Sequence, residues 1–363
     1  MTRPRLANPI GREFLLACTV CGLLSLPAPG GPAPPDVFTT LETDIPADLP
    51  PLLCGDTAWI LSRKGRIGLA EQGASKTEEL SPLAPPAVEP ICAGKGIVWI
   101  DGAGDSWHVG KGGRTLVEQG LTEVLFLKGT PEGAVLLFRD RLRLADGSDL
   151  RLPIAAEGLT VLAGGSLWVY GEEAGAFVES EGAIRWVWRP GDLRPGPAAA
   201  SKDRIFVATK DGALVSLVRR SGKERYRFSC GAAIVSAPVC LEGRVIFASR
   251  DHLVRALSAK GGTVLWQRRL EGRPDFGPYE VPGGIAFLES VGNRLIVLSP
   301  EAGKRSWSWT APEGVFLQPP AFQGAGAVLI AWGESAVPHL YRIDIPPQSK
   351  VADESSRKAE AAP

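Results

Sequence analysis

The feature of this sequence that most limits its fold is a short pattern that returns about every 40 residues. In most copies the pattern is a strand segment that begins with a polar residue or glycine and continues with an apolar residue, any residue and an aromatic residue. The aromatic residues of the pattern are Trp59, Trp99, Trp168, Phe206, Phe247 and Phe287. Successive members lie 40, 69, 38, 41 and 40 residues apart, so the long interval spans one weaker copy around Phe138. A fixed period of this size is typical of architectures in which each repeat packs on its neighbours.

Prolines mark the same phase of the repeat and indicate the number of copies. They stand at Pro51, Pro90, Pro197, Pro238, Pro278 and Pro320. The interval from Pro51 to Pro320 corresponds to seven repeats of about 38 residues, which makes eight starts. We therefore expect eight units, with seven as the alternative because the third and fourth copies are degenerate.

Each copy has the pattern of four short strands. A strand with alternating apolar residues, such as 212–217 or 252–257, follows the aromatic strand. A Gly-Lys or Gly-Gly turn then precedes a further strand that carries Tyr226, Trp266 or Trp307. Polar turns between half-buried strands, without helical periodicity, indicate antiparallel hairpins. The sequence predicts an all-β protein, a β-propeller of four-stranded antiparallel blades, over residues 36–346.

The last copy is incomplete, which bears on how the ring closes. It holds three predicted strands within residues 321–344 and then runs into Pro346 and Pro347. The alternating segment 37–41 can supply the missing strand, which would join the first and last blades and remove an exposed sheet edge. Residues 347–363 are polar and mixed in charge, as is typical of a disordered tail.

The first 30 residues have the pattern of a bacterial secretory signal peptide. Arg3, Arg5 and Arg12 precede an apolar run of 13 residues, Phe14–Leu26. A helix that spans a bilayer needs about 20 residues. A lipid anchor at Cys18 is the less favoured alternative, because residues 15–18 match the lipoprotein cleavage pattern. We expect an exported protein, periplasmic or associated with the envelope, with no transmembrane span in the mature chain.

The cysteines permit a disulfide once the signal segment is removed. Four of the six cysteines would remain, and an even number in an exported chain is compatible with disulfide formation. Cys230 and Cys240 lie ten residues apart and form the candidate pair. The alternative is that these cysteines are small buried thiols within strands.

Several residue types that often mark a site have a simpler structural interpretation here. Five tryptophans recur at one phase of the repeat, at Trp186, Trp188, Trp266, Trp307 and Trp309, and we expect them to pack between neighbouring blades.

The three histidines, His108, His252 and His339, fall in different repeats, so a shared metal ion is not predicted. With 40 Lys and Arg against 40 Asp and Glu, the chain is not a nucleic-acid binder that relies on net positive charge.

The order of motifs over residues 196–309 resembles the pyrroloquinoline-quinone-type (PQQ-like) propeller repeat. An apolar-x-Phe strand, an Asp-Gly-x-Leu turn and a Gly-Lys-x-x-Trp segment follow one another there. That family contains quinoprotein dehydrogenases and also cofactor-free propellers such as the outer-membrane assembly lipoprotein BamB. The resemblance implies the fold more strongly than a function. The dehydrogenases carry two adjacent cysteines over the quinone, whereas no two cysteines are adjacent here, so we predict no cofactor, no metal and no catalytic residues.

The remaining candidate site is one set of turns on a rigid ring. The turns that follow the aromatic strands carry Arg63, Lys64, Asp101, Asp105, Lys210, Asp211, Arg250, Asp251 and His252. Repeat symmetry puts these turns on one face, and loops on a stiff scaffold are where binding residues concentrate. We therefore predict a non-catalytic scaffold for a protein partner, with envelope or outer-membrane assembly components suggested by the resemblance. Ordinary solvated turns and a divergent quinoprotein dehydrogenase are the alternatives.

Overall fold

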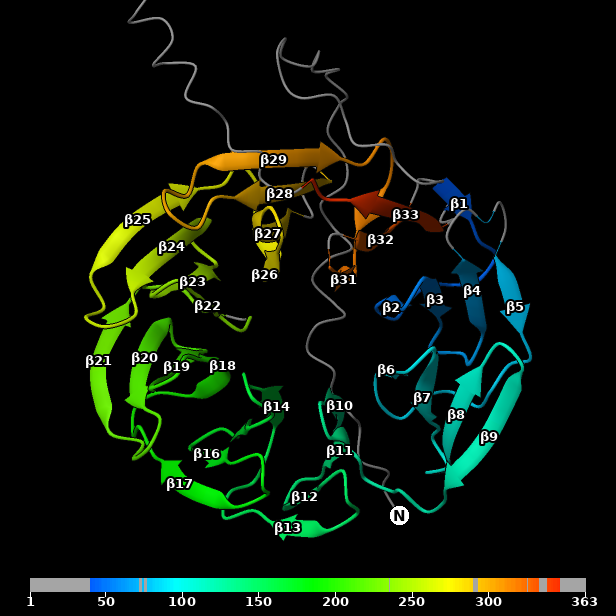
Figure 1. The fold of residues 1–363 in the computed structure, drawn as a ribbon, viewed down its shortest axis with the longest axis horizontal. Coiled ribbons are helices and arrows are strands. Elements are labelled where there is room, and N and C mark those ends of the chain that lie inside the picture. The colour runs from blue at the N-terminus through cyan, green and yellow to red at the C-terminus, as the bar shows by residue number, and fades with distance from the viewer. Residues whose placement is uncertain are drawn as a thin grey trace, which may run out of the picture. The chain divides into compact units, whose positions relative to one another are not determined.

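The computed structural model describes residues 40–346 except 72–73, 75–76, 235, 290–292, 325 and 333–337, and leaves out the side chains of 40–42 and 275. The described residues form 33 β-strands in eight sheets, and no helix occurs among them. The sheets stand around a ring as the blades of a propeller (Figure 1). The prediction of an eight-bladed all-β propeller is confirmed. The predicted signal segment 1–30 and tail 347–363 lie outside the described residues.

In the first seven blades, four antiparallel strands follow one another in chain order from the centre of the ring outward (Figure 1). The strands of blades 1 and 2 are β2 (Leu52–Cys54), β3 (Thr57–Leu61), β4 (Ile67–Glu71), β5 (Glu78–Leu80), β6 (Ile91–Ala93), β7 (Gly96–Ile100), β8 (Ser106–Gly110) and β9 (Gly113–Glu118). Those of blades 3 and 4 are β10 (Phe126–Thr130), β11 (Gly133–Leu137), β12 (Arg141–Arg143), β13 (Asp149–Arg151), β14 (Gly158–Val161), β15 (Leu167–Tyr170), β16 (Gly175–Val178) and β17 (Ile184–Trp188).

The second half of the ring has longer and more regular strands. Blades 5 and 6 contain β18 (Pro195–Ala200), β19 (Arg204–Thr209), β20 (Ala213–Val218), β21 (Glu224–Ser229), β22 (Val239–Leu241), β23 (Arg244–Ser249), β24 (Leu253–Ser258) and β25 (Val264–Arg269). Blade 7 contains β26 (Pro274–Val281), β27 (Gly284–Glu289), β28 (Arg294–Leu298) and β29 (Arg305–Thr310). Blade 8 is built from β30 (Val315–Phe316), β31 (Ala321–Gln323), β32 (Gly326–Trp332), β33 (Pro338–Asp344) and the N-terminal β1 (Thr40–Glu42).

The ring is closed by a strand from the opposite end of the chain. β1 pairs antiparallel with β33 as the outermost strand of blade 8, with Thr40 opposite Tyr341 and Leu41 opposite Leu340. The expectation that the segment around residues 37–41 completes the last blade is confirmed for Thr40 and Leu41, while residues 37–39 lie outside the description. Closure covers the edge of β33 that would otherwise present unpaired backbone groups.

The repeated aromatic residues form the cores between neighbouring blades. Trp59, Trp99, Trp168, Phe206, Phe247 and Phe287 all have an exposed fraction of 0%. The second strands of blades 5, 6 and 7 are buried on both faces because blades pack against both of their sides, which explains their nearly continuous runs of apolar residues. Outermost strands are half in water, and all six residues of β9 are exposed. The cores therefore lie between blades rather than at the centre of the ring.

A second aromatic position joins the outermost strands of blades 4, 5 and 6 to the next blade along the chain. Trp186 Nε1 donates a hydrogen bond of 2.8 Å to the carbonyl oxygen of Arg219 in blade 5. The hydroxyl of Tyr226 and the indole of Trp266 make equivalent bonds to Ser258 and Pro300, at 3.2 Å and 2.8 Å. The prediction that the repeated tryptophans pack between blades is confirmed. Trp186 and Trp266 make these bonds, Trp188 packs in the core shared with blade 5, and Trp307 and Trp309 pack in the core shared with blade 8.

We expect Gly303→Ala to lower the free energy of unfolding by about 3 kcal/mol. Gly303 has a φ of 62° and lies under the Trp266 ring, where a Cβ would be 2.5 Å from Cε3. The matched control is Gly324→Ala, at a φ of 59° with no atom within 4 Å of the new Cβ, for which the expected loss is about 1 kcal/mol. Urea unfolding measures both values. Equal losses in the two variants would show that the Trp266 contact contributes nothing to the cost.

Candidate functional site

The sequence-predicted partner residues lie in the turns that join the second and third strands of a blade. These turns are β3–β4, β7–β8, β19–β20 and β23–β24. Since every blade runs outward from the centre with antiparallel neighbours, all the second strands point the same way, and these turns emerge on one side of the ring. Connections from one blade to the next emerge on that same side. We call this side the loop face.

The predicted residues differ widely in exposure. Arg63, Lys64, Lys210, Asp211 and Arg250 are exposed to solvent. Asp105, Asp251 and His252 are partly buried, and Asp101 is only 5% exposed. The first group can contact a partner directly, whereas the others need a structural explanation.

The carboxylate of Asp101 shapes its own turn. Its Oδ1 accepts hydrogen bonds from the backbone N–H groups of Ala103 and Asp105, both at 3.0 Å. Its Oδ2 accepts a bond of 3.1 Å from Nε1 of Trp107. With its acceptors occupied and its side chain buried, Asp101 organises the β7–β8 turn rather than contacting a partner, which corrects its place among the predicted contact residues.

Asp251 has a similar local role in blade 6. It accepts hydrogen bonds from Arg255 and Ser249 at 2.5 Å and 2.6 Å, and from the backbone N–H of Leu253 at 3.1 Å. Burial would raise the pKa of Asp251, but these hydrogen bonds outweigh it and hold the pKa below its usual range. Asp251 is therefore a fixed anion that positions the buried guanidinium of Arg255.

The loop face is hollowed beside blades 3 to 6. One cavity of about 610 Å³ is lined by charged groups and by an apolar wall between blades 3 and 4; its lining includes Arg139, Glu157, Glu172, Glu173, Arg189, Leu125, Pro153 and Ile154. A second, of about 350 Å³, is lined by Tyr170, Arg194, Pro197, Lys210, Ala233, Ile234 and Arg250. Sequence reasoning assigned Lys210 and Arg250 to this face, and the turn residues Glu172 and Glu173 belong to the same phase of the repeat. It did not find the lining residues in the connections between blades, because these connections vary and carry no repeated motif.

Ion pairs join the blades that surround these cavities. Lys210 Nζ lies 3.1 Å from Oε2 of Glu157, which precedes blade 4. Arg194 contacts Asp211 twice, through its backbone N–H at 2.6 Å and through its guanidinium at 3.0 Å. The backbone hydrogen bond from Arg194 is the largest cause of a lowered pKa for Asp211, and the Arg194 guanidinium adds to it. Lys210–Glu157 thus links blade 5 to the connection before blade 4, and Arg194–Asp211 ties the connection that enters blade 5 to a turn of that blade.

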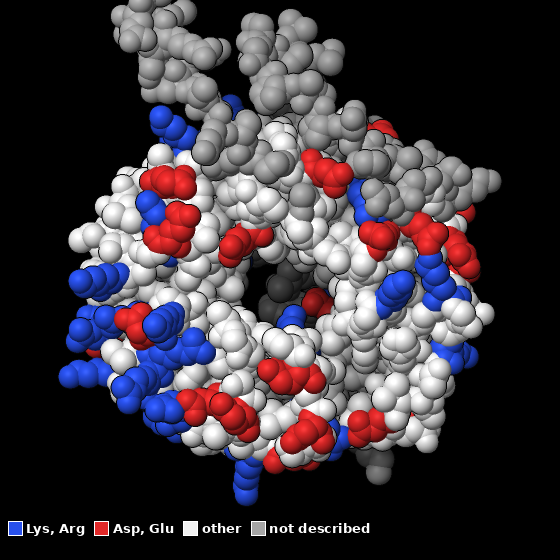
Figure 2. Space-filling view, viewed as in Figure 1, with Lys and Arg blue, Asp and Glu red and all other residues white. Residues whose placement is uncertain are grey.

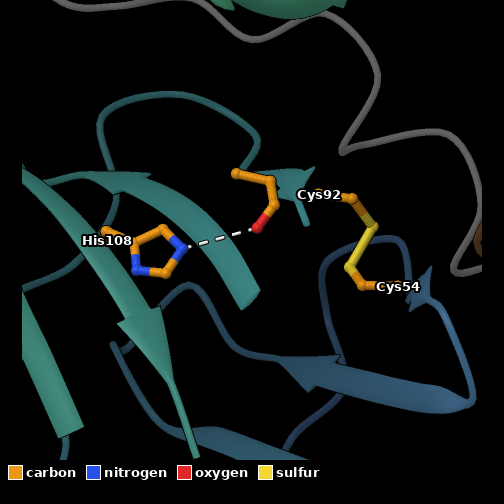
Figure 3. Close-up of a disulfide and its surroundings, with 4 residues drawn as sticks. Cys54, Cys92 and His108 are labelled. Carbon is orange, nitrogen blue, oxygen red and sulfur yellow. Dashed lines mark hydrogen bonds between the residues drawn. A yellow bond between two sulfur atoms is a disulfide. The ribbon is translucent and has the colours of Figure 1, made fainter. Parts of the chain in front are cut away.

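The disulfide of the structure joins Cys54 and Cys92, with their Cα atoms 5.5 Å apart (Figure 3). Cys54 pairs with Thr57 and Cys92 with Ile97 on the innermost strands of blades 1 and 2, so each cysteine stands opposite the residue two before the repeated tryptophan of its blade. Neighbouring innermost strands bring equivalent positions together, which explains why the bonded cysteines are one repeat apart. Close by, Nε2 of His108 lies 3.4 Å from the carbonyl oxygen of Ala93.

The predicted disulfide between Cys230 and Cys240 is not formed, and both are free thiols. Cys230 follows the outermost strand of blade 5, whereas Cys240 lies in the innermost strand of blade 6. The Cys230 thiol instead lies 3.1 Å from the carbonyl oxygen of Gly212. Burial raises the pKa of the Cys240 thiol to about 12, so it remains protonated at neutral pH. The alternative of buried thiols within strands holds in part: both thiols are free and partly buried, and Cys240 lies within β22, whereas Cys230 follows the end of β21.

The histidines do not come together. His108 is in blade 2, His252 in the β23–β24 turn and His339 in blade 8, where its Nε2 lies 3.1 Å from Glu313. Within the described residues, no group of three or more His, Cys, Asp or Glu side chains is placed to hold a metal ion. No helix in that part of the chain has the length and apolar character to cross a membrane.

Comparison with known proteins identifies the repeats. A family model described as outer membrane protein assembly factor BamB matches residues 171–313 and, overlapping them, residues 250–345. Residues 171–345 of this propeller are PQQ-like repeats of the BamB type. They run from the middle of blade 4 to the end of blade 8, which is the more regular half of the ring. No curated protein matches the chain in sequence.

Solved structures share the fold at low sequence identity. The C-terminal WD40 domain of Sif2 aligns over 87% of this chain and 100% of its own length, at 15% identity and a TM-score of 0.63. The computationally designed Ika8 protein aligns over 84% of this chain and 99% of its own, at 12% identity and a TM-score of 0.60. BamB from Moraxella catarrhalis aligns over 85% of both chains, at 16% identity and a TM-score of 0.42. At these identities the first two structures bear on the fold alone, and the third, with a TM-score below 0.5, carries no argument.

Proposed function

We propose that this BamB-type propeller is a non-catalytic scaffold that binds a protein partner through its loop face. The observation that supports this most directly is the pair of adjoining cavities whose walls are fixed by Lys210–Glu157 and Arg194–Asp211. A surface whose charged groups are already positioned loses little conformational entropy on binding. Exposed Arg63, Lys64 and Arg250 extend this surface around the ring.

We further infer that the protein acts outside the cytoplasm, in the envelope, and that the partner is a component of outer-membrane protein assembly. Two observations support this finer proposal. The matching family is described as an outer-membrane assembly factor. The first 30 residues carry the pattern of a secretory signal. Both are inferences from sequence likeness and extend the scaffold proposal to a place and a partner class.

A photo-crosslinking amino acid at defined positions tests the proposal in intact cells. Replacement of Lys64 or Arg250 samples the loop face, and replacement of the exposed Lys95, in the β6–β7 turn on the opposite side of the ring, is the matched control. We expect a crosslinked outer-membrane assembly component from the first two positions, at about tenfold the yield from Lys95.

Two results would overturn the proposal. Equal crosslinking from Lys95 and the loop-face positions would mean that the loop face is not the binding surface. An absorbance spectrum of bound quinone in the purified protein, together with dehydrogenase activity, would favour the alternative of a divergent quinoprotein enzyme.

A further inference from the structure

Charge is distributed very unevenly around this electrically neutral chain. Residues 185–273, which hold blades 5 and 6, contain 18 Lys and Arg but only 7 Asp and Glu. All other residues together contain 22 Lys and Arg against 33 Asp and Glu. Figure 2 shows Lys and Arg gathered along the side of the ring that carries β21 and β25 in Figure 1. We call residues 185–273 the basic sector.

The outer strands of this sector carry cations that the protein itself does not neutralise. Lys223 and Arg225 near β21, and Arg268 and Arg269 on β25, are exposed and form no ion pair with any described residue. Like charges so close together repel one another, and a partner of opposite charge relieves that repulsion. The sector therefore has an electrostatic preference for anionic partners.

A groove at the outer rim gives this preference a defined place. It lies between the outer edges of blades 6 and 7, has a volume of about 270 Å³, and we call it the rim groove. Buried Leu270, Ile296 and Leu298 contribute the apolar part of its lining. Five cations line the rest, at Arg268, Arg269, Arg294, Lys304 and Arg305, with Glu271 the acidic residue among them.

Contacts between the blades fix the position of the groove. Trp266 Nε1 donates to the carbonyl oxygen of Pro300, and Arg268 Nε donates a bond of 3.0 Å to the carbonyl oxygen of Gly303. Arg294 forms an ion pair with Glu271, with Nη2 of the arginine 2.8 Å from Oε2 of the glutamate. Arg269, Lys304 and Arg305 remain exposed and without an ion pair to any residue in the described ranges. Three cations are thus available to a ligand beside an apolar surface that is already in place.

We propose that the rim groove binds an acidic segment of a partner polypeptide. Arginine presents a planar fork that matches a carboxylate in two hydrogen bonds, so Arg269 and Arg305 suit Asp and Glu side chains. The apolar lining suits aliphatic side chains between the acidic ones. Val264 and Leu265, 46% and 49% exposed, lie outside the groove at the start of the same strand, where a longer segment could reach them. A flat bilayer surface cannot enter a groove between two blades, which favours a polypeptide over anionic lipid.

This inference rests on the proposed scaffold function but uses other residues. The rim groove runs along the outer edge of blades 6 and 7, from Leu270 and Glu271 in the β25–β26 connection, where it meets the loop face, to Lys304 in the β28–β29 turn on the opposite side. The two cavities of the loop face lie instead beside blades 3 to 6. The two surfaces let one propeller hold a partner at two places, which raises the overall affinity without any change in the individual contacts.

Binding of a fluorescently labelled peptide to the full chain, measured by fluorescence anisotropy, tests the groove. The peptide has about 16 residues, in which pairs of Glu alternate with pairs that contain Leu. We expect the double variant R269E/R305E to weaken binding at least about tenfold, and R269Q/R305Q to give an intermediate loss. The matched control is K95E/R151E, which makes the same change of net charge at exposed positions in blades 2 and 3 and should weaken binding less than about twofold. A peptide with Gln in place of Glu should not bind measurably.

Several results would overturn the proposal. Equal weakening by the groove and control variants would mean that net charge, not the groove, attracts the peptide. Binding to phosphatidylglycerol vesicles that R269E/R305E abolishes, with no binding of the peptide, would assign the groove to lipid. No binding of the Glu peptide at low ionic strength would remove the groove as a site. None of these results depends on crosslinking at the loop face, so failure here and failure of the scaffold proposal are distinguishable.

Discussion

Replacement of Trp168 by alanine is expected to lower the free energy of unfolding by about 4 kcal/mol. The Trp168 side chain is fully buried in the core between blades 4 and 5, in contact with the rings of Trp186 and Trp188. Its Nε1 donates a hydrogen bond of 2.9 Å to the carbonyl oxygen of Gly196 in blade 5. The alanine variant therefore loses packing, opens a cavity and leaves a buried carbonyl without its donor.

Urea unfolding followed by tryptophan fluorescence and by circular dichroism measures this loss. Trp168→Phe separates its two causes, because it keeps most of the ring volume and loses only the hydrogen bond, with an expected cost of about 1–2 kcal/mol. Val117→Ala on β9, where the side chain is 64% exposed, is the control and should stay within about 0.5 kcal/mol of the parent. A loss below about 1 kcal/mol for Trp168→Ala would show that the blades do not depend on this core.

Removal of the disulfide as C54A/C92A is expected to cost about 3–4 kcal/mol. The bond closes a loop of 38 residues between the innermost strands of blades 1 and 2, and cross-linking such a loop restricts the unfolded chain. The reduced parent protein should lose the same amount as the double variant, and the difference in denaturation midpoint between oxidised and reduced protein measures it.

The free cysteines provide the matched control for the disulfide. C230A/C240A also removes two sulfur atoms but no bond, so reducing agent should still destabilise that variant by the full amount. If C230A/C240A loses its response to reducing agent while C54A/C92A retains it, the assignment of the bonded pair is wrong.

The repeat carried most of the information from which the fold could be predicted. Second-strand aromatics such as Trp59 and Phe247 recur because every interface between blades needs a large side chain at the same place, so their spacing reports the number of blades. Blade 3 was the weakest copy for a physical reason. Its β12 and β13 have three residues each, and Phe138 stands just after β11 rather than within it. The aromatic residue is still buried there, at 2% exposure, but its local motif is altered.

The candidate site was less accessible to sequence reasoning. The disulfide joins Cys54 and Cys92 because equivalent positions on the innermost strands of neighbouring blades lie side by side. The sequence favoured Cys230 and Cys240 because they are close together in it, and that pair is not bonded. Asp101 has the sequence context of an exposed turn residue, yet its carboxylate is turned inward to accept three hydrogen bonds. Glu157, the partner of Lys210, and Arg194, the partner of Asp211, lie in connections between blades, where no repeated motif marks them.

The pairing of β1 with β33 ties completion of the fold to the direction of synthesis. Thr40 leaves the ribosome roughly 300 residues before its partner Tyr341. At about 5–20 residues per second, β1 waits at least about 15 seconds for the strand that receives it. During that time finished blades have an open side where the next blade will pack. A nascent chain of this protein therefore needs protection from other chains until its last strand is made, and a chain that stops before β33 has most of the repeats but no closed ring.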